Sequence, residues 1–174
     1  ADFPKINPAQ IAIDPGLPKE KHMRWAALLR HQTPEETVAI LRQLKLDNDT
    51  INRVKTLVQW WKRPVGADQT QIRRTMSQMA PELYDDLLVL KTSVGELELQ
   101  AEGCVEDLDW VKAQSGEIRQ RGDCVSLKEL AVTGADLIQA GMKPGKELGE
   151  TLKRLLELVL EHPEWNTKEI LKKV

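Results

Sequence analysis

The chain contains few aromatic residues, and this scarcity argues against a sheet-rich fold. Aromatic residues make up 4% of the 174 residues, and five of the seven are Trp. A sheet-rich core usually contains more aromatic and β-branched side chains. Leu, Ala, Glu, Lys and Gln dominate instead, and these residues favour helices. We therefore expect an all-α fold.

Long apolar runs and cysteine pairs with metal-binding spacing are also missing. No run approaches the roughly 20 apolar residues that span a bilayer. The segment ADFPKINPAQ has neither the basic n-region nor the apolar h-region of a signal peptide. Cys104 and Cys124 are the only cysteines, which is typical of a reduced intracellular protein. We expect a cytoplasmic protein without membrane contact. Because the chain does not begin with Met, we also expect a part of a longer protein.

Charge is distributed unevenly, although the formal net charge is only −2. Residues 1–80 carry 13 basic and 8 acidic side chains, residues 81–124 carry 4 and 11, and residues 125–174 carry 8 of each. A polyanion would be attracted by the first part and repelled by the middle part. The distribution permits nucleic-acid binding but does not by itself indicate it.

Helix-start signals divide the chain into short amphipathic helices. Thr33-Pro-Glu-Glu36 is a capping box, and Ser126–Glu129 and Thr133–Asp136 resemble two further starts. Asn166 is expected to cap a last short helix. The apolar spacing over residues 96–121 predicts one long helix.

The change of composition at Gly122 suggests the domain organisation. We expect a helical body over residues 1–121 and a smaller helical tail domain over residues 122–174.

Residues that could carry catalysis are not arranged for it. Asp47/Asp49 and Asp107/Asp109 are Asp-x-Asp pairs, but residues two apart on a helix diverge by about 200°. Acidic residues at helix starts are the more common explanation for both pairs. The histidines are not paired at ligand spacing, and there is no phosphate-binding P-loop. We predict no catalytic and no metal-binding residues in this chain.

The stretch GMKPGKELGE, residues 141–150, is the most unusual local sequence. Gly141 can end one helix, and Pro144 is expected at the first position of the next. Lys143, Gly145 and Lys146 would then lie at a positive helix N-terminus, where a phosphate can bind. The alternative is that the glycines allow a neighbouring helix to pack closely.

Arg73 and Arg74 are a second candidate for phosphate contact. They follow Ile72 on a helix whose apolar face also includes Met76. The spacing predicts that Arg73 borders the core and that Arg74 points outward. Solvated arginines are the default interpretation, and RNA binding is the alternative.

The segment SLKELAVTGADLIQAGMKPGKELGETLKRLLELVLEHPEWNTKEIL is similar to a C-terminal pattern, roughly DLAVTGKDLI-x-LGIKPG-x-x-LG-x-x-L followed by an Asn, that is found in bacterial tRNA nucleotidyltransferases. The chain thus resembles this family, which includes CCA-adding enzymes and poly(A) polymerases. The stretches MRWAALLRHQ and INRVKTLVQWW are similar to earlier parts of the family. In relatives with an HD phosphohydrolase-type domain, a His-Asp and a His-His pair in these stretches bind metal. Arg30-His31 and Trp60-Trp61 stand at these positions, so the resemblance implies a degenerate HD-like body without that metal chemistry.

The resemblance also implies a function. The family's helical body and tail hold the elbow and acceptor arm of tRNA, and a separate N-terminal head of mixed α/β structure adds nucleotides. No such head is visible in this sequence, so Mg²⁺ and CTP or ATP would belong to the missing head. The chain alone is expected to be non-catalytic and without a cofactor. Its expected partners are tRNA and its own catalytic head, and homodimerisation stays open.

Two other functions stay open. A degenerate HD-type metal phosphohydrolase would use His22 and His31. A helical protein-interaction module would contact no RNA at all.

Overall fold

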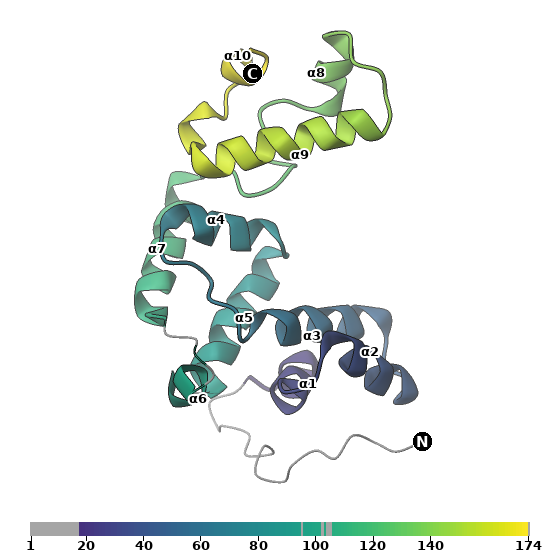
Figure 1. Cartoon of the computed structure of the whole chain (residues 1–174), viewed down its shortest axis with the longest axis vertical. Helices are drawn as coiled ribbons and strands as arrows, with labels where there is room; N and C mark the ends of the chain where they lie inside the picture. The colour runs from purple at the N-terminus through teal and green to yellow at the C-terminus, as the bar shows by residue number, and fades with distance from the viewer. Residues whose placement is uncertain (1–17, 95, 102, 104–105, 174) are drawn as a thin grey trace. The chain divides into compact units, whose positions relative to one another are not determined.

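The computed structural model describes residues 18–94, 96–101, 103 and 106–173. These residues form ten α-helices and a 3₁₀ helix and contain no strand, which confirms the all-α prediction (Figure 1). Within this part of the chain, no helix is both long enough and apolar enough to cross a bilayer.

The chain divides into two compact units. Among the described residues, unit 1 comprises those within 1–65 and 79–110, and unit 2 comprises those within 66–78 and 111–174. The helices of unit 1 are α1 (Lys21–Leu29), α2 (Pro34–Gln43), α3 (Asn48–Trp60), α5 (Pro81–Val94) and α6 (Glu96–Ala101). Those of unit 2 are α4 (Gln69–Ser77), α8 (Gly134–Gln139), α9 (Lys146–Glu161), the 3₁₀ helix η2 (Pro163–Trp165) and α10 (Lys168–Leu171). Helix α7 (Leu108–Arg121) begins in unit 1 and lies mostly in unit 2.

This division differs from the domain boundary expected at residues 121 and 122. Gln69 of α4 donates a 2.6 Å hydrogen bond to Gln114 of α7, and Arg121 of α7 donates a 2.7 Å bond back to Gln69. Arg73 of α4 donates to the carbonyl oxygen of Leu160 in α9, so α4 and most of α7 belong with the tail helices in unit 2. Contacts in space define a unit, so two segments distant in the sequence can share one.

In unit 1, α3 contacts α1, α2 and α5 (Figure 1). The apolar spacing of α3 and its C-cap predicts that Ile51, Val54, Val58 and Trp61 face the core, and all four are buried, with Trp61 fully enclosed. Helix α1 is expected from its sequence to be built on Trp25, Leu28 and Leu29, but only Leu29 of these three is buried. Its buried residues are Met23, Ala26, Ala27 and Leu29, whereas Trp25 and Leu28 are only half-buried.

The prediction of one long helix over residues 96–121 is wrong, because two helices, α6 and α7, occupy this range. Gly103 lies between them with a φ of 81°, a left-handed conformation that α-helical backbone does not adopt. Asp107 then accepts a 2.9 Å hydrogen bond from the backbone N–H of Trp110 and caps the start of α7.

The helix starts of unit 2 are partly as predicted. Thr133 and Asp136 form a complete capping box at α8, and the expected box of Thr33 and Glu36 is present at α2 of unit 1. Residues 126–129, however, form only a turn, in which Glu129 accepts hydrogen bonds from Val125 and Ser126. The Glu129 carboxylate thus bonds to residues at the start of the turn, and residues 126–129 do not begin a helix.

Asn166 does not cap the last helix. Thr167 is the N-cap of α10, since its side chain accepts from the N–H of Ile170. Asn166 instead accepts from the N–H of Ala131 at 2.7 Å and donates to the carbonyl oxygen of Glu129 at 3.0 Å. It thus fixes the turn at residues 126–129 from 35 or more residues away in the sequence.

One hydrophobic cluster of unit 2 contains residues of α8, α9 and α10 and of the segment before α8. Helices α8 and α10 lie on the same side of α9 (Figure 1). The buried residues of the cluster are Cys124, Leu130, Val132, Leu137, Leu155, Val159 and Leu171. Burial raises the pKa of the Cys124 thiol, which fits a packing role for this side chain.

Candidate nucleic-acid interface

The connection between α8 and α9 carries three of the predicted RNA-binding residues. Gly141 ends α8 with a φ of 103°, as expected. The N–H of Met142 donates to the carbonyl oxygen of Leu137 at 3.0 Å, and the N–H of Gly141 donates to the carbonyl oxygen of Ile138 at 3.0 Å. This pair of bonds is a Schellman motif, which satisfies the last carbonyls of a helix and turns the chain sharply.

The start of α9 is open to solvent. Its first residue is Lys146 and its N-cap is Gly145, so Pro144 precedes the helix rather than opening it. The prediction for Pro144 is wrong because Gly145 has a φ of 154° and separates the proline from the helical residues. Gly145 has no side chain to bind the first N–H groups, and these groups keep their capacity to bind an anion.

The two predicted lysines at this connection are exposed. The Lys146 side chain is 91% exposed, and its Nζ lies 3.7 Å from Glu150. Such a surface pair contributes little to stability. The Lys143 side chain has no ion pair with another residue that the structure describes. Both ammonium groups are therefore available to a ligand.

The glycines of this connection are not covered by a neighbouring helix. A Cβ built at Gly145 or Gly149 would meet no heavy atom of the described chain within 4 Å. The alternative explanation, close helix packing, thus has no partner among the described residues.

Arg73 and Arg74 have separate environments, as their spacing predicts. Arg73 is 4% exposed, and it donates to the carbonyl oxygen of Leu160 at 2.7 Å and pairs with Asp123 at 3.3 Å. The Arg74 side chain is 42% exposed and pairs with Glu157 and Glu161 of α9. Contact of either residue with RNA stays a prediction, and for Arg73 it would require these internal contacts to open.

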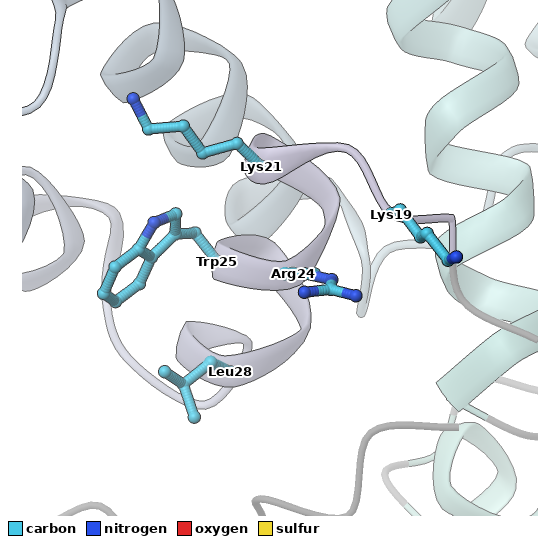
Figure 2. Close-up of a pocket in the computed structure, with 5 residues that line it drawn as sticks. All are labelled: Lys19, Lys21, Arg24, Trp25 and Leu28. Carbon is cyan, nitrogen blue, oxygen red and sulfur yellow. The ribbon is translucent and has the colours of Figure 1, made fainter. Parts of the chain in front are cut away.

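A cleft on α1 brings together side chains that the sequence did not single out as a site. It has a volume of about 400 Å³ and is lined by Lys19, Lys21, Arg24, Trp25 and Leu28. Figure 2 shows Trp25 and Leu28 projecting from the same side of α1, with Lys21 one turn before them and Arg24 and Lys19 towards the other side. Lys21 pairs with Asp47 at 3.1 Å, and both side chains are more than half exposed.

The comparison with protein families gives a match over almost the whole chain. The family of tRNA nucleotidyltransferase domain 2 matches residues 18–174. The chain belongs to this family. Comparisons with curated proteins and with solved structures gave no match. The expected resemblance is thereby confirmed at the level of the family.

As a tRNA nucleotidyltransferase domain 2, the chain has structural contacts at the positions where HD-type relatives are expected to bind metal. The Nε of Arg30 lies 3.1 Å and the Nε2 of His31 2.8 Å from the same oxygen of Glu98. The indole N–H of the buried Trp61 donates to the carbonyl oxygen of Arg30. A guanidinium and an indole thus occupy the centre of this region.

Other titratable residues of the domain are also engaged in local structure. Asp47 caps α3 by accepting from Thr50 at 2.9 Å, and Asp49 pairs with Arg53 at 2.8 Å. His22 lies 2.6 Å from Asp86. In the described ranges, no three His, Cys, Asp or Glu side chains come together as a metal site would require.

The α1 cleft of the domain was missed because the apolar pattern assigned Trp25 and Leu28 to the core. One signal was nevertheless present in the sequence. Lys19, Lys21 and Arg24 fall within six residues and immediately precede a tryptophan, and this mixture of cations and an aromatic ring is typical of nucleic-acid contacts.

Proposed function

We propose that this chain is the tRNA-binding portion of a CCA-adding tRNA nucleotidyltransferase. The chain would hold the elbow and acceptor arm of tRNA while an N-terminal head, with Mg²⁺ and CTP or ATP, adds nucleotides in the cytoplasm. The observation that carries the proposal is the family match over residues 18–174. Every tRNA must be accepted, so recognition would use shape and phosphates rather than base sequence.

The connection between α8 and α9 supports this role physically. Lys143 and Lys146 are exposed beside a helix start whose N-cap, Gly145, leaves the first N–H groups uncapped by a side chain. Backbone N–H groups and ammonium groups together favour a phosphate. Glu147 in the first turn of α9 opposes an anion, so a single phosphate there would bind weakly, and affinity would come from several such contacts.

Direct binding of tRNA tests the proposal. The purified chain should bind tRNA with an affinity that falls steeply as salt rises, and it should incorporate neither CTP nor ATP into tRNA. Incorporation by the chain alone would contradict the proposed absence of catalysis. Failure to bind tRNA at low salt would contradict the proposed function itself.

A charge-reversed variant locates the contact. Lys143→Glu/Lys146→Glu should weaken tRNA binding, whereas Lys172→Glu/Lys173→Glu makes the same change of net charge elsewhere in unit 2 and should weaken it less. Equal effects of the two double variants would show a general charge effect rather than a site. No effect of either would favour a helical interaction module without RNA contact.

A further inference from the structure

We propose that the α1 cleft binds one unpaired nucleotide of an RNA strand, with its base against Trp25 and its flanking phosphates near Lys19, Lys21 and Arg24. This inference rests on the proposed function, because it takes RNA as the partner. It adds a site in unit 1 and a class of ligand, single-stranded RNA, that the family match does not specify.

The charged side chains of the cleft favour a polyanion. Within the part of the chain that the structure describes, the exposed Lys19 and Arg24 side chains form no ion pair. Lys21 shares its charge with Asp47, but both side chains stay more than half exposed. Among the residues that the structure describes, the charged ones that line the cleft are all basic, so the cleft complements a phosphodiester chain.

The apolar side of the cleft suits a nucleobase. Trp25 and Leu28 are three residues apart on α1, and both are half-buried and project in the same direction (Figure 2). The opposite face of the helix is held in the core of unit 1 by Met23 and Ala26, which are fully buried. A ring presented from a fixed helix loses little entropy when a base stacks on it.

Two clefts of unit 2 are lined by acidic as well as basic side chains. The cleft along α9 is lined by Lys153 and Arg154 but also by Glu157 and Glu161. In the cleft beside Arg73, the guanidinium is paired with Asp123 at 3.3 Å. In both, carboxylates reduce the attraction for a phosphate.

A membrane surface would be the other partner for a helix with cations and a tryptophan. Binding in the plane of a membrane requires a wide apolar helix face. In α1, most of the apolar residues are in the protein core, and only Trp25 and Leu28 remain for an external ligand. That area suits one base better than a lipid layer.

The test measures binding of fluorescent tRNA and of a fluorescent single-stranded RNA of about eight nucleotides. Fluorescence anisotropy over a range of salt concentrations gives both the affinity and its salt dependence. Trp25→Ala should weaken binding of the short RNA at least about fivefold, which corresponds to the loss of one stacked base. Trp25→Phe keeps an aromatic ring and should restore most of the affinity.

Arg24→Gln tests the phosphate contact of the cleft, and Lys55→Gln is its control. Lys55 is an exposed lysine of α3 that does not line the cleft. Arg24→Gln should reduce the slope of log affinity against log salt by about 1, and Lys55→Gln should reduce it less. Circular dichroism of each variant checks that the helices remain folded.

The outcomes separate this inference from the proposed function. If tRNA binds the unaltered chain but Trp25→Ala and Arg24→Gln bind with unchanged affinity and slope, the α1 site is wrong and the proposed function stands. If tRNA does not bind but the short RNA binds in a Trp25-dependent way, the site stands and the function fails. Failure of both RNAs to bind, or Trp25-dependent binding to phosphatidylserine vesicles in place of RNA, overturns the site.

Discussion

Arg73 donates a 2.7 Å hydrogen bond from Nε to the carbonyl oxygen of Leu160. Leu160 lies in the last turn of α9, where carbonyl groups have no partner within the helix. The guanidinium therefore caps the negative end of α9 from α4. The same group pairs with Asp123 and donates to Thr70 at 3.2 Å, so one side chain connects three segments of unit 2.

Replacement of Arg73 should destabilise unit 2. Arg73→Met leaves the carbonyl of Leu160 without its donor and removes one cation from Asp123, whose side chain is 7% exposed. We expect the free energy of unfolding to fall by about 3 kcal/mol, towards the lower end of the range for a broken buried pair, because Asp123 keeps Arg121 at 2.8 Å. Urea unfolding followed by circular dichroism measures the change.

Arg74 provides the matched control, since it is the next residue and has the same charge. It pairs with Glu157 and Glu161 at the surface, where such pairs contribute about 1 kcal/mol or less. Arg74→Met should therefore cost under about 1 kcal/mol. Equal losses for the two variants would mean that burial of Arg73 has no special role.

Local signals in the sequence predicted local structure well. The capping boxes at Thr33 and Thr133 form because each depends on residues three apart. The contrast between Arg73 and Arg74 follows from the helical period, which the apolar positions Ile72 and Met76 define.

Features that depend on distant contacts were not predictable. The face of α1 is one example, since its apolar residues permit more than one orientation. The structure buries the small Ala26 and Ala27, and small side chains let helix axes approach closely. Nothing in the segment itself shows which neighbour it will meet, so Trp25 was assigned to the core and the α1 cleft was missed.

The glycines at 141 and 149 should respond to alanine in opposite directions. Gly141 has a φ of 103°, which an alanine adopts only with strain, so Gly141→Ala should lower the free energy of unfolding by about 1 to 2 kcal/mol. Gly149 is an exposed residue inside α9 with open space around a Cβ. Gly149→Ala should raise the free energy of unfolding by about 0.5 to 1 kcal/mol. Urea unfolding of both variants gives the two signs.

The same glycine variant also tests the approach of RNA to α9. If a phosphate lies against the start of this helix, the methyl group of Gly149→Ala should weaken tRNA binding although the protein becomes more stable. Unchanged affinity would place the RNA away from that side of α9.

Divalent metal should not stabilise the protein. A ligand that binds only the native state raises its apparent stability, but Arg30 and His31 are both directed at Glu98, and no metal-binding group of three is present in the described residues. The Tm of the protein without a histidine tag should be the same in EDTA and in excess Mn²⁺ or Zn²⁺. A rise in Tm that disappears in His22→Ala or His31→Ala would instead favour the metal phosphohydrolase.

Acid should remove the contribution of Asp136 to the stability of unit 2. This carboxylate accepts hydrogen bonds from the N–H of Thr133 at 2.9 Å, from its hydroxyl at 2.7 Å and from Lys168 at 3.0 Å. These three contacts, the Thr133 bonds foremost, hold the pKa of Asp136 well below its ordinary value. A lowered pKa in the folded state means that the stabilisation is complete above the unfolded pKa of about 4 and is lost as the pH falls through the folded value.

The difference in free energy of unfolding between the unaltered protein and Asp136→Asn should thus be largest near about pH 7 and should narrow below about pH 4. Lys168→Gln, which removes only the weakest of the three contacts, should give a smaller difference that narrows over the same range. A difference that stays constant down to about pH 3 would show that the charge of Asp136 contributes nothing and that only the shape of the capping box matters.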